Sequence, residues 1–560
     1  MDGFQPDSAR QKVIARHAEL IGSALDAIRT RRAWSPFRDS PSTKIHGPDK
    51  PAAGKAAFEA QLGRPFELDL PGIVGRAGAE VSPYTLEPLG VTYPVCDPEA
   101  LVSAAQTALP GWAAADPELR AALCAEMAMR LYDVNFEMAH AVMHVAGQSY
   151  TQAFSGSGPN ALDRGLEALA YAVKAMRDVS RSGRYEREFG GELVTLDKTY
   201  VLVPRGVGLV ICCASFPTWN AYPAMFASLA TGNPVIVKPH PIAVLPMAIV
   251  VRECRRVLLE HGFDPNLVTL AVDTLDDPVA QKLVDHPAVQ IVDFTGSPRY
   301  GGHLERTVTG KLLFTETAGV NTVVVESVED LGSVARAVAR ASCLFSAQMC
   351  TSPQVIYVCP ELTADFGRAL VEQIDAIADD PAQAAGIMGA IQGAVSLRAV
   401  SSVRGSIEQQ PRARVLREAA PYRHAQFPNA RTLTPLVVAV DGAAPELYAE
   451  EHFGPVLFVV AMDPDAAVAE ATRLAREHGS ISSYLYSTDE AFIDRSTPLY
   501  ERAGANLTIN LTGAMWINFA AAYSDYHVTG LNPAGNACLA DLAFVASRFR
   551  IVQRRRPATP

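Results

Sequence analysis

Short runs of Val, Ile and Leu alternate with longer amphipathic segments from Tyr200 to Val325. This alternation is typical of β-α-β units, in which parallel strands are joined by crossover helices. Because the runs are almost continuously apolar, we expect a parallel sheet with helices on both faces, the Rossmann-like arrangement that binds nucleotides. The expected strands are 208–213, 234–238, 267–272, 289–294 and 322–325, and the expected helices are 222–230, 245–261, 278–284 and 299–308.

The length of the chain requires more than one domain. A chain of 560 residues exceeds the roughly 250 to 300 at which one hydrophobic core stops growing. Helical apolar spacing over residues 8–32 leads into a stretch rich in Pro, Ser and Lys, and two or three packed helices are expected over 97–147. We therefore predict an α/β chain in four parts: a helical extension with a connector (1–88), a nucleotide-binding domain (89–325), a second α/β domain (326–535) and a C-terminal strand with a tail (536–560).

The composition argues against several classes of protein. A net charge of −11 disfavours a nucleic-acid partner or an anionic membrane surface. The N-terminus lacks the basic and apolar segments of a secretory signal, and no window offers about 18 uninterrupted apolar residues, so we expect a cytoplasmic protein without membrane spans. The nine cysteines include no C-x-x-C pair, so we expect neither disulfides nor a structural metal site.

Two segments of the predicted sheet could bind a dinucleotide. Gly296 and Ser297 lie where a predicted strand ends and a predicted helix begins, so their backbone N–H groups could approach a pyrophosphate. Lys238 ends an earlier strand and would lie at the same carboxyl edge, where cofactors bind in such sheets. A single glycine turn is weak support, and a lysine at a strand end commonly points to solvent. These residues by themselves leave both interpretations open.

Cys350 lies among small and polar residues, from Ser346 to Pro353, which is compatible with a partly exposed loop. A cysteine becomes a useful nucleophile when a helix terminus or a positive charge lowers the pKa of its thiol. Without such a neighbour, a cysteine is more often an inert residue of the core. The local sequence does not decide between a nucleophile and a structural residue.

Six motifs in order along the chain resemble those of the aldehyde dehydrogenase superfamily, over roughly residues 90 to 545. They are an aromatic-Asn segment (Phe216–Pro223), a strand ending in lysine (Ala230–Pro239), a glycine turn (Phe294–Ser297), a glutamate motif (Glu316–Asn321), a Gln-Met-Cys motif (Gln348–Cys350) and a Glu-His-Phe-Gly-Pro motif (Glu451–Pro455). The separation between the glutamate and the cysteine also matches that family. The resemblance implies a Rossmann-like domain, an α/β catalytic domain and an oligomerisation strand segment.

The resemblance assigns a catalytic role to three residues. Cys350 would attack the aldehyde carbon and form a thiohemiacetal, whose oxyanion needs hydrogen-bond donors. The side-chain amide of Asn220 and the backbone N–H of Cys350 would supply those donors. After hydride transfer, Glu316 would activate water to hydrolyse the thioester, because water at neutral pH is a poor nucleophile without a general base.

The same resemblance implies a nicotinamide cofactor. Lys238 and Glu451 would hydrogen-bond its ribose hydroxyls, and Phe453 would pack beside the nicotinamide ring. NAD-preferring members often carry a glutamate three residues after the strand lysine, where it repels a 2′-phosphate, but this chain has Pro241 there. We therefore expect NADP to be accepted, and preferred over NAD, with His240 as a candidate phosphate contact.

Departures from the superfamily pattern resemble the PaaN-type aldehyde dehydrogenases of phenylacetate degradation. They are Thr-Ala-Gly after Glu316, the segment from Ser524 to Asn536, Trp34-Ser-Pro-Phe and Ser82-Pro-Tyr. This resemblance implies a CoA-linked semialdehyde formed by ring opening as the substrate, with a separate hydratase as a possible partner. The family also implies a homodimer or tetramer, bridged by a hairpin near 184–203 and a last strand near 544–553.

Two alternative functions stay open at this stage. A CoA-acylating dehydrogenase would pass the acyl group to coenzyme A instead of water, although such an enzyme has less need of Glu316. A cofactor-binding homologue could keep the fold without turnover. The joint presence of Cys350, Asn220 and Glu316 argues against that second alternative.

Overall fold

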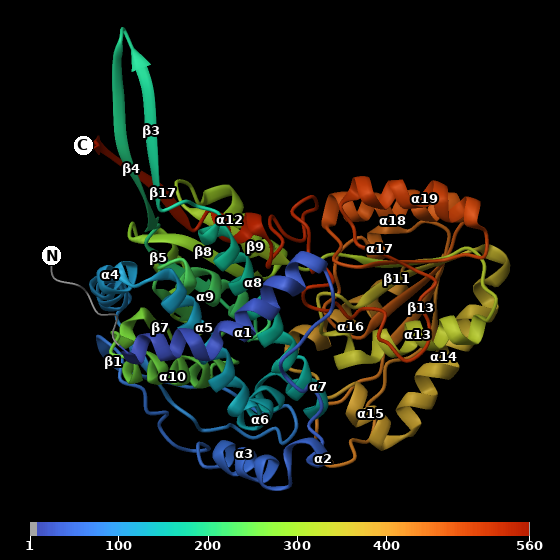
Figure 1. Cartoon of the computed structure of the whole chain (residues 1–560). Coiled ribbons are helices and arrows are strands. Elements are labelled where there is room, and N and C mark those ends of the chain that lie inside the picture. The colour runs from blue at the N-terminus through green and yellow to red at the C-terminus, as the bar shows by residue number, and fades with distance from the viewer. Residues whose placement is uncertain (1–7, 559–560) are drawn as a thin grey trace.

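The computed structural model describes residues 8–558, and its centre is a five-stranded parallel sheet (Figure 1). The strands are β5 (Val207–Ile211), β6 (Val235–Lys238), β7 (Val268–Leu270), β8 (Val289–Gly296) and β9 (Leu312–Thr317). Their order is β7-β6-β5-β8-β9. Every residue of β5 and β6 is buried, as expected for a parallel sheet covered on both faces. The predicted Rossmann-like fold class is therefore confirmed.

Four helices follow these strands at nearly the predicted positions: α9 (Ala221–Ala230), α10 (Leu245–Glu260), α11 (Ala280–Asp285) and α12 (Pro298–Thr307). The strands differ from the prediction in two places. The sequence did not predict β9, because half of it is polar (Leu-Leu-Phe-Thr-Glu-Thr) and lacks a continuous apolar run. The predicted strand 322–325 exists as β10 (Asn321–Val325), but it pairs with strands of the second sheet, so its assignment to the nucleotide-binding sheet was wrong.

The second sheet has seven strands in the order β12-β13-β14-β11-β10-β15-β16, all parallel except the edge strand β12. Its further strands are β11 (Pro353–Val358), β12 (Ala413–Arg417), β13 (Leu436–Asp441), β14 (Val456–Ala461), β15 (Ser483–Tyr486) and β16 (Leu507–Ile509). One face is covered by α13 (Leu331–Cys343) and α14 (Pro360–Asp379), and the other by α16 (Ala394–Ile407), α18 (Pro464–His478) and α19 (Glu490–Ala503). This sheet therefore has a core of its own on each face.

Helices that precede the first sheet in the chain pack around it (Figure 1). They are α1 (Ser8–Thr30), α4 (Pro98–Ala114), α5 (Pro117–Asp133), α6 (Asn135–Ala146) and α8 (Pro159–Arg177). Asp97 and Asp116 each cap the helix that follows, by accepting a backbone N–H two residues on at 2.8 Å. Short elements complete the chain: α2 (Thr43–His46), α3 (Asp49–Glu59), α7 (Tyr150–Ser155), α15 (Pro381–Ile387), α17 (Pro445–Tyr448), β1 (Ile73–Ala77) and β2 (Tyr93–Cys96). None of the helices between residues 8 and 558 is long and apolar enough to cross a bilayer.

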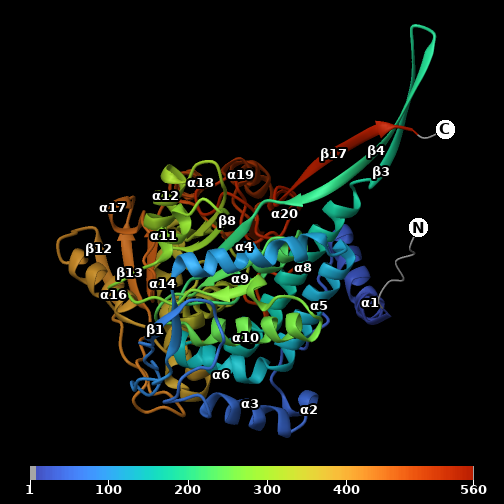
Figure 2. The same ribbon diagram turned by 90° about the vertical axis from the view of Figure 1, so that its left-hand side faces the viewer.

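A long hairpin projects from the body of the molecule (Figures 1 and 2). It consists of β3 (Ser182–Phe189) and β4 (Glu192–Pro204), and the last strand, β17 (Phe549–Pro557), pairs antiparallel with β4. The last strand begins later than the predicted residue 544, because Leu542–Ala546 forms the short helix α20. The buried pair of Arg548 and Asp293, 2.6 Å apart, anchors β17 to the first sheet.

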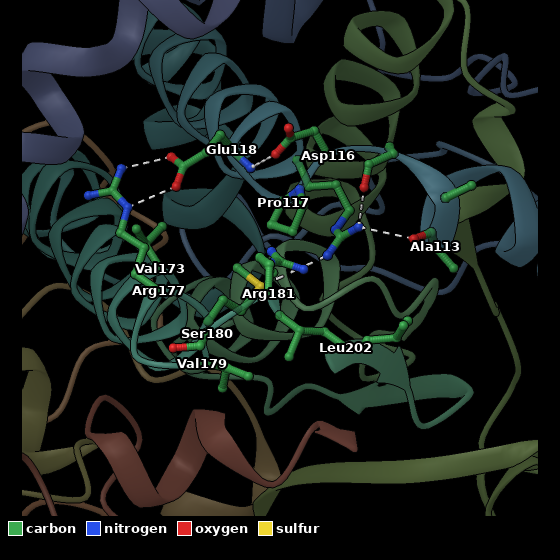
Figure 3. A pocket seen from close by; sticks show the side chains of 15 residues that line it. Ala113, Asp116, Pro117, Glu118, Val173, Arg177, Val179, Ser180, Arg181 and Leu202 are labelled. Carbon is green, nitrogen blue, oxygen red and sulfur yellow. Dashed lines mark hydrogen bonds and ion pairs between the residues drawn. The ribbon is translucent and has the colours of Figure 1, made fainter. Parts of the chain in front are cut away.

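A cavity of about 660 Å³ lies at the base of this hairpin (Figure 3). Arg120 of α5 connects two segments of its wall, because its guanidinium donates to the carbonyl oxygens of Ala115 at 2.6 Å and Ala230 at 3.0 Å. Arg177 and Glu118 form a second pair across its rim, at 2.7 Å. No described residue lines both this cavity and the one that contains Cys350, so it belongs to the scaffold beneath the hairpin.

Candidate active site

A second cavity, of about 870 Å³, lies at the carboxyl ends of the strands of the first sheet. This volume is in the range of small-molecule and cofactor sites. All the site residues predicted from the sequence line it: Asn220, Lys238, His240, Gly296, Ser297, Glu316, Cys350, Glu451 and Phe453. Loops of the second sheet supply the last three of them. The cavity is therefore shared by the two sheets.

The turn before Cys350 has an unusual backbone. Phe345, Ser346 and Ala347 have φ values of +52°, +48° and +53°, although none of them is glycine. The left-handed region costs a residue with a side chain about 1 to 2 kcal/mol, so the surrounding structure must hold this turn in place. The Ser346 hydroxyl donates to the carbonyl of Met388 at 3.2 Å, and Phe345 is fully buried.

Two buried amides hold the rest of this loop. Gln348 donates to the carbonyl oxygens of Phe345 and Ala390, each at 3.1 Å, and accepts the backbone N–H of Gln392 at 2.9 Å. Asn321 donates to the carbonyl of Cys350 at 2.8 Å, and its oxygen accepts from the backbone of a loop before β15. The Gln of the Gln-Met-Cys motif and the Asn of the glutamate motif are therefore positioning residues for the cysteine.

Cys350, Glu316 and His527 form a compact trio in the cavity. The Cys350 thiol donates to Glu316 Oε1 at 3.9 Å, and His527 Nε2 lies 3.0 Å from the same oxygen. The three ligand atoms lie within 4.8 Å of one another, and sulfur, carboxylate and imidazole are also the ligand types that zinc prefers. The spacing of cysteines in the sequence gives no sign of this cluster, because its members come from β9, the turn after α13 and the loop before α20.

Burial and the adjacent Glu316 carboxylate raise the pKa of the Cys350 thiol well above its usual value. The thiol of the free protein is therefore protonated at neutral pH and is a weak nucleophile. We expect inactivation of the free protein by iodoacetamide to accelerate about tenfold per pH unit between about pH 7 and pH 9, because only the thiolate reacts. Inactivation rates measured across that range would contradict this expectation if they reached a plateau below pH 8.

Asn220 immediately precedes α9 and lines the same cavity as Cys350. Its side-chain oxygen is buried without a hydrogen-bond partner among the described residues. An unpaired buried polar atom normally costs free energy, so such atoms often mark a site that a ligand completes. The Asn220 side chain therefore lines the cavity with an oxygen that lacks a partner among the described residues.

A buried lysine and a glycine turn line another part of the cavity. Lys238 Nζ lies 2.6 Å from Asp273 Oδ1 and donates to the carbonyl of Pro239 at 3.0 Å. Nearby, Ser297 caps α12, and a Cβ on Gly296 would lie 2.7 Å from the ring of Phe294. This turn brings the N-terminus of a ten-residue helix to the cavity wall, where it suits a pyrophosphate.

Glu451 lines the cavity on a loop that is held by Gln354 of β11. Gln354 donates to the carbonyl of Glu450 at 2.8 Å and accepts the backbone N–H of His452 at 2.7 Å. Burial raises the pKa of Glu451 to about 8, so this carboxyl is largely protonated in the free protein at neutral pH. Its loop fixes Glu451 and Phe453 on the same wall of the cavity.

Comparison with known proteins identifies the family from most of the chain. The model of the aldehyde dehydrogenase family matches residues 79–510. The chain belongs to the aldehyde dehydrogenase family. The expectations of an aldehyde dehydrogenase fold and of an oxidoreductase that uses NAD or NADP are therefore confirmed, while the PaaN-type subfamily stays a prediction.

Individual members of the family give the same result. A crystal structure of an NAD-dependent aldehyde dehydrogenase from Burkholderia multivorans is 42% identical, with a TM-score of 0.94, and the match covers 98% of this chain and 99% of that one. The N-succinylglutamate 5-semialdehyde dehydrogenase of Pseudomonas fluorescens (strain Pf0-1) is 26% identical, over 79% of this chain and 87% of its own. An NADP-dependent glyceraldehyde-3-phosphate dehydrogenase from Bacillus halodurans C-125, solved with NADP, shares the fold at 18% identity, with a TM-score of 0.69, over 86% of this chain and 96% of its own.

Sequence reasoning on this dehydrogenase missed His527 and Asp273. His527 lies in a segment that departs from the superfamily pattern, but a lone histidine there carries no sign that it contacts Glu316. Asp273 follows β7 and looks like an ordinary loop carboxylate in the sequence. Burial and Lys238 lower the pKa of His240 to about 4, so its imidazole is neutral at pH 7, and its role as a phosphate contact stays a prediction.

We expect replacement of His527 by phenylalanine to slow turnover by about 10- to 100-fold, because a hydrogen bond to a charged group contributes about 1.5 to 3 kcal/mol. The change removes the imidazole that holds Glu316 at 3.0 Å. Stopped-flow measurement should show an unchanged first burst of reduced dinucleotide and a slower steady state. His527→Gln keeps an N–H donor and should recover part of the rate, whereas equal loss in both variants would indicate a packing role only.

Proposed function

We propose that this enzyme oxidises an aldehyde to a carboxylic acid through a thioester on Cys350, with water as the final acyl acceptor. The supporting observation is the convergence of Cys350, Glu316 and Asn220 on one cavity, with the thiol 3.9 Å from the carboxylate. A nucleophile, a general base and an oxyanion donor are the three groups that this reaction needs. The enzyme would use NAD or NADP, held by Lys238 and the Gly296 turn.

The reaction begins when the Cys350 thiol gives its proton to solvent water and its sulfur attacks the aldehyde carbon to give a thiohemiacetal. The Asn220 amide and the backbone N–H of Cys350 stabilise the negative oxygen that forms. A bound NAD or NADP supplies the hydride acceptor. Loss of the hydride leaves the acyl group on the sulfur as a thioester. Glu316 then takes a proton from water, whose oxygen attacks the thioester, releases the acid and restores the thiol.

The position of Glu316 favours water over coenzyme A as the acyl acceptor. Its side chain is 1% exposed, lies next to the sulfur and is held by His527. A thiol acceptor such as coenzyme A has less need of a general base, because thiols ionise more readily than water. An acylating enzyme would gain little from a carboxylate fixed at this place.

For the substrate, we propose a CoA-linked semialdehyde from ring opening of an aromatic-derived compound, delivered by a separate hydratase. This part rests on the resemblance to PaaN-type enzymes. The segments that carry it help to build the cavity wall, since Thr317 and Ala318 after Glu316 and His527 of the segment from Ser524 to Asn536 line it. Trp34 of the N-terminal motif packs against Tyr523, the residue before that C-terminal segment, with ring centroids 5.5 Å apart.

A panel of aldehydes tests the proposal. Short aliphatic, aromatic and CoA-linked semialdehydes would be incubated with enzyme and with NAD or NADP, with and without free coenzyme A. We expect reduction of the dinucleotide without coenzyme A, a carboxylic acid product by mass spectrometry, and the highest kcat/KM for the CoA-linked compounds. A strict need for free coenzyme A, with an acyl-CoA product, would establish the acylating alternative. Absence of turnover across the panel would favour the non-catalytic homologue.

We also propose that the hairpin of β3 and β4, together with β17, joins subunits into a dimer or tetramer. These strands expose large apolar side chains, with 50% of Phe189, 69% of Leu193 and 54% of Ile551 accessible in the single chain. Apolar side chains in a projecting edge commonly mark an interface. Light scattering coupled to gel filtration should give at least twice the mass of one chain, and a monomer at micromolar concentration would reject the idea.

A further inference from the structure

Lys238 and Asp273 form a buried ion pair at the adenosine end of the cavity. Their side chains are 7% and 1% exposed, and Lys238 Nζ lies 2.6 Å from Asp273 Oδ1. The other carboxylate oxygen accepts the backbone N–H of Val279 at 3.0 Å. Because β6 and β7 are adjacent parallel strands, their carboxyl ends bring the two residues together. The Asp273 carboxylate is held on both sides and stays beside the lysine.

Charges around this pair leave no free cation. Among the described residues that line the cavity, Lys238 is the one lysine or arginine. His240 stands next to it with a pKa lowered to about 4 by burial and by the lysine, so it is neutral at pH 7. The N–H of Ile242 points to His240 Nδ1 at 3.4 Å. A 2′-phosphate carries between one and two negative charges, and the one cation that it would meet among these residues is the already paired ammonium of Lys238.

We propose that Asp273 makes this dehydrogenase selective for NAD over NADP. Lys238 uses two of its three N–H donors on Asp273 and Pro239, which leaves one for a ribose hydroxyl. A phosphate in place of that hydroxyl would stand close to the Asp273 carboxylate and be repelled. The Asp273 carboxylate, which follows the neighbouring strand, thus takes the place of the glutamate that NAD-preferring members often carry at the position of Pro241. This inference reverses the preference for NADP expected from the sequence, which considered position 241 alone.

Binding measurements test the inference without an aldehyde. Isothermal titration calorimetry of the full-length enzyme with NAD, NADP, 5′-ADP and 2′,5′-ADP would give four dissociation constants. We expect NAD to bind at least about tenfold more tightly than NADP, and 5′-ADP more tightly than 2′,5′-ADP by a similar factor. Equal or tighter binding of the 2′-phosphorylated ligands would overturn the proposal. This part of the test needs no variant, so it stands even if a substitution impairs folding.

The Asp273→Asn variant assigns the selectivity to this residue. Asparagine keeps an acceptor for the backbone N–H of Val279 and removes the charge. We expect the preference for NAD over NADP to shrink by about tenfold, mainly through tighter NADP binding. Asp276→Asn, on the exposed part of the same loop, is the matched control and should leave the ratio unchanged. An unchanged ratio in Asp273→Asn, or an equal shift in the control, would reject a specific role for Asp273.

The inference rests on the proposed function only for the binding of a dinucleotide. The two can fail separately, because calorimetry and aldehyde turnover are independent measurements. A protein that binds NAD selectively but oxidises no aldehyde would keep the role of Asp273 and reject the proposed reaction. An enzyme that turns over aldehydes with NADP as well as with NAD would support the proposed reaction and reject the role of Asp273.

Discussion

Replacement of Cys350 by alanine is expected to lower kcat by about 10⁴-fold or more, because covalent catalysis is lost when its nucleophile is removed. The thiol lies in the shared cavity, next to Glu316, and its loop is fixed by Gln348 and Asn321. Absorbance of the reduced nicotinamide measures turnover. Calorimetry with NAD should give a dissociation constant within about twofold of the wild type, because the cysteine side chain is small and contributes little to dinucleotide binding.

Cys213 supplies a matched control for this variant. It also lines the cavity, but its thiol donates to the carbonyl of Phe216 at 3.3 Å, and it has no general base of its own. Cys213→Ala should retain most of the activity. Substantial turnover by Cys350→Ala, or loss of turnover in Cys213→Ala alone, would show that the nucleophile has been assigned to the wrong cysteine.

Replacement of Glu316 by glutamine is expected to slow steady-state turnover by about 10²- to 10⁴-fold, the usual contribution of a general base. The defect should fall on hydrolysis of the thioester. Rapid mixing with aldehyde and dinucleotide should therefore still give a burst of about one reduced dinucleotide per active site. Hydroxylamine attacks thioesters without a general base, so it should accelerate turnover of this variant and yield a hydroxamate.

The same variant distinguishes two roles for Glu316. Its carboxylate accepts the Cys350 thiol at 3.9 Å, so it could also take the proton of the thiol before attack on the aldehyde. If that were its main role, Glu316→Gln would show no burst, and hydroxylamine would not help. A burst followed by slow turnover instead assigns Glu316 to the activation of water.

Local sequence predicted the parts of this site that are continuous along the chain. Lys238 ends a run of apolar residues, and Gly296 and Ser297 join a strand to a helix, so pattern and turn chemistry indicate their places. Cys350 was ambiguous as a single residue and gained its role from the order of six motifs. The sequence could not show the left-handed turn from Phe345 to Ala347, because three consecutive residues with side chains rarely adopt it.

Tertiary contacts account for what the sequence did not show. His527 meets Glu316 across 211 residues of chain, and Asp273 meets Lys238 across 35, so neither pair has a local pattern. The strand that carries Glu316 is half polar and faces a cavity, which hides it from a search for apolar runs. Because β9 was not predicted, the next strand along the chain, β10, was assigned to the first sheet in its place.

The central claim is a thioester on Cys350, and mass spectrometry of Glu316→Gln, after digestion into peptides, tests it most directly. The variant would be mixed with an aldehyde that the wild type oxidises and with dinucleotide, quenched in acid and digested. We predict one adduct per chain, on the peptide that contains Cys350, with the mass of the aldehyde less two hydrogen atoms, and its loss after hydroxylamine treatment. Reduced dinucleotide formed without any adduct on that peptide, or with the adduct on another residue, would contradict the account.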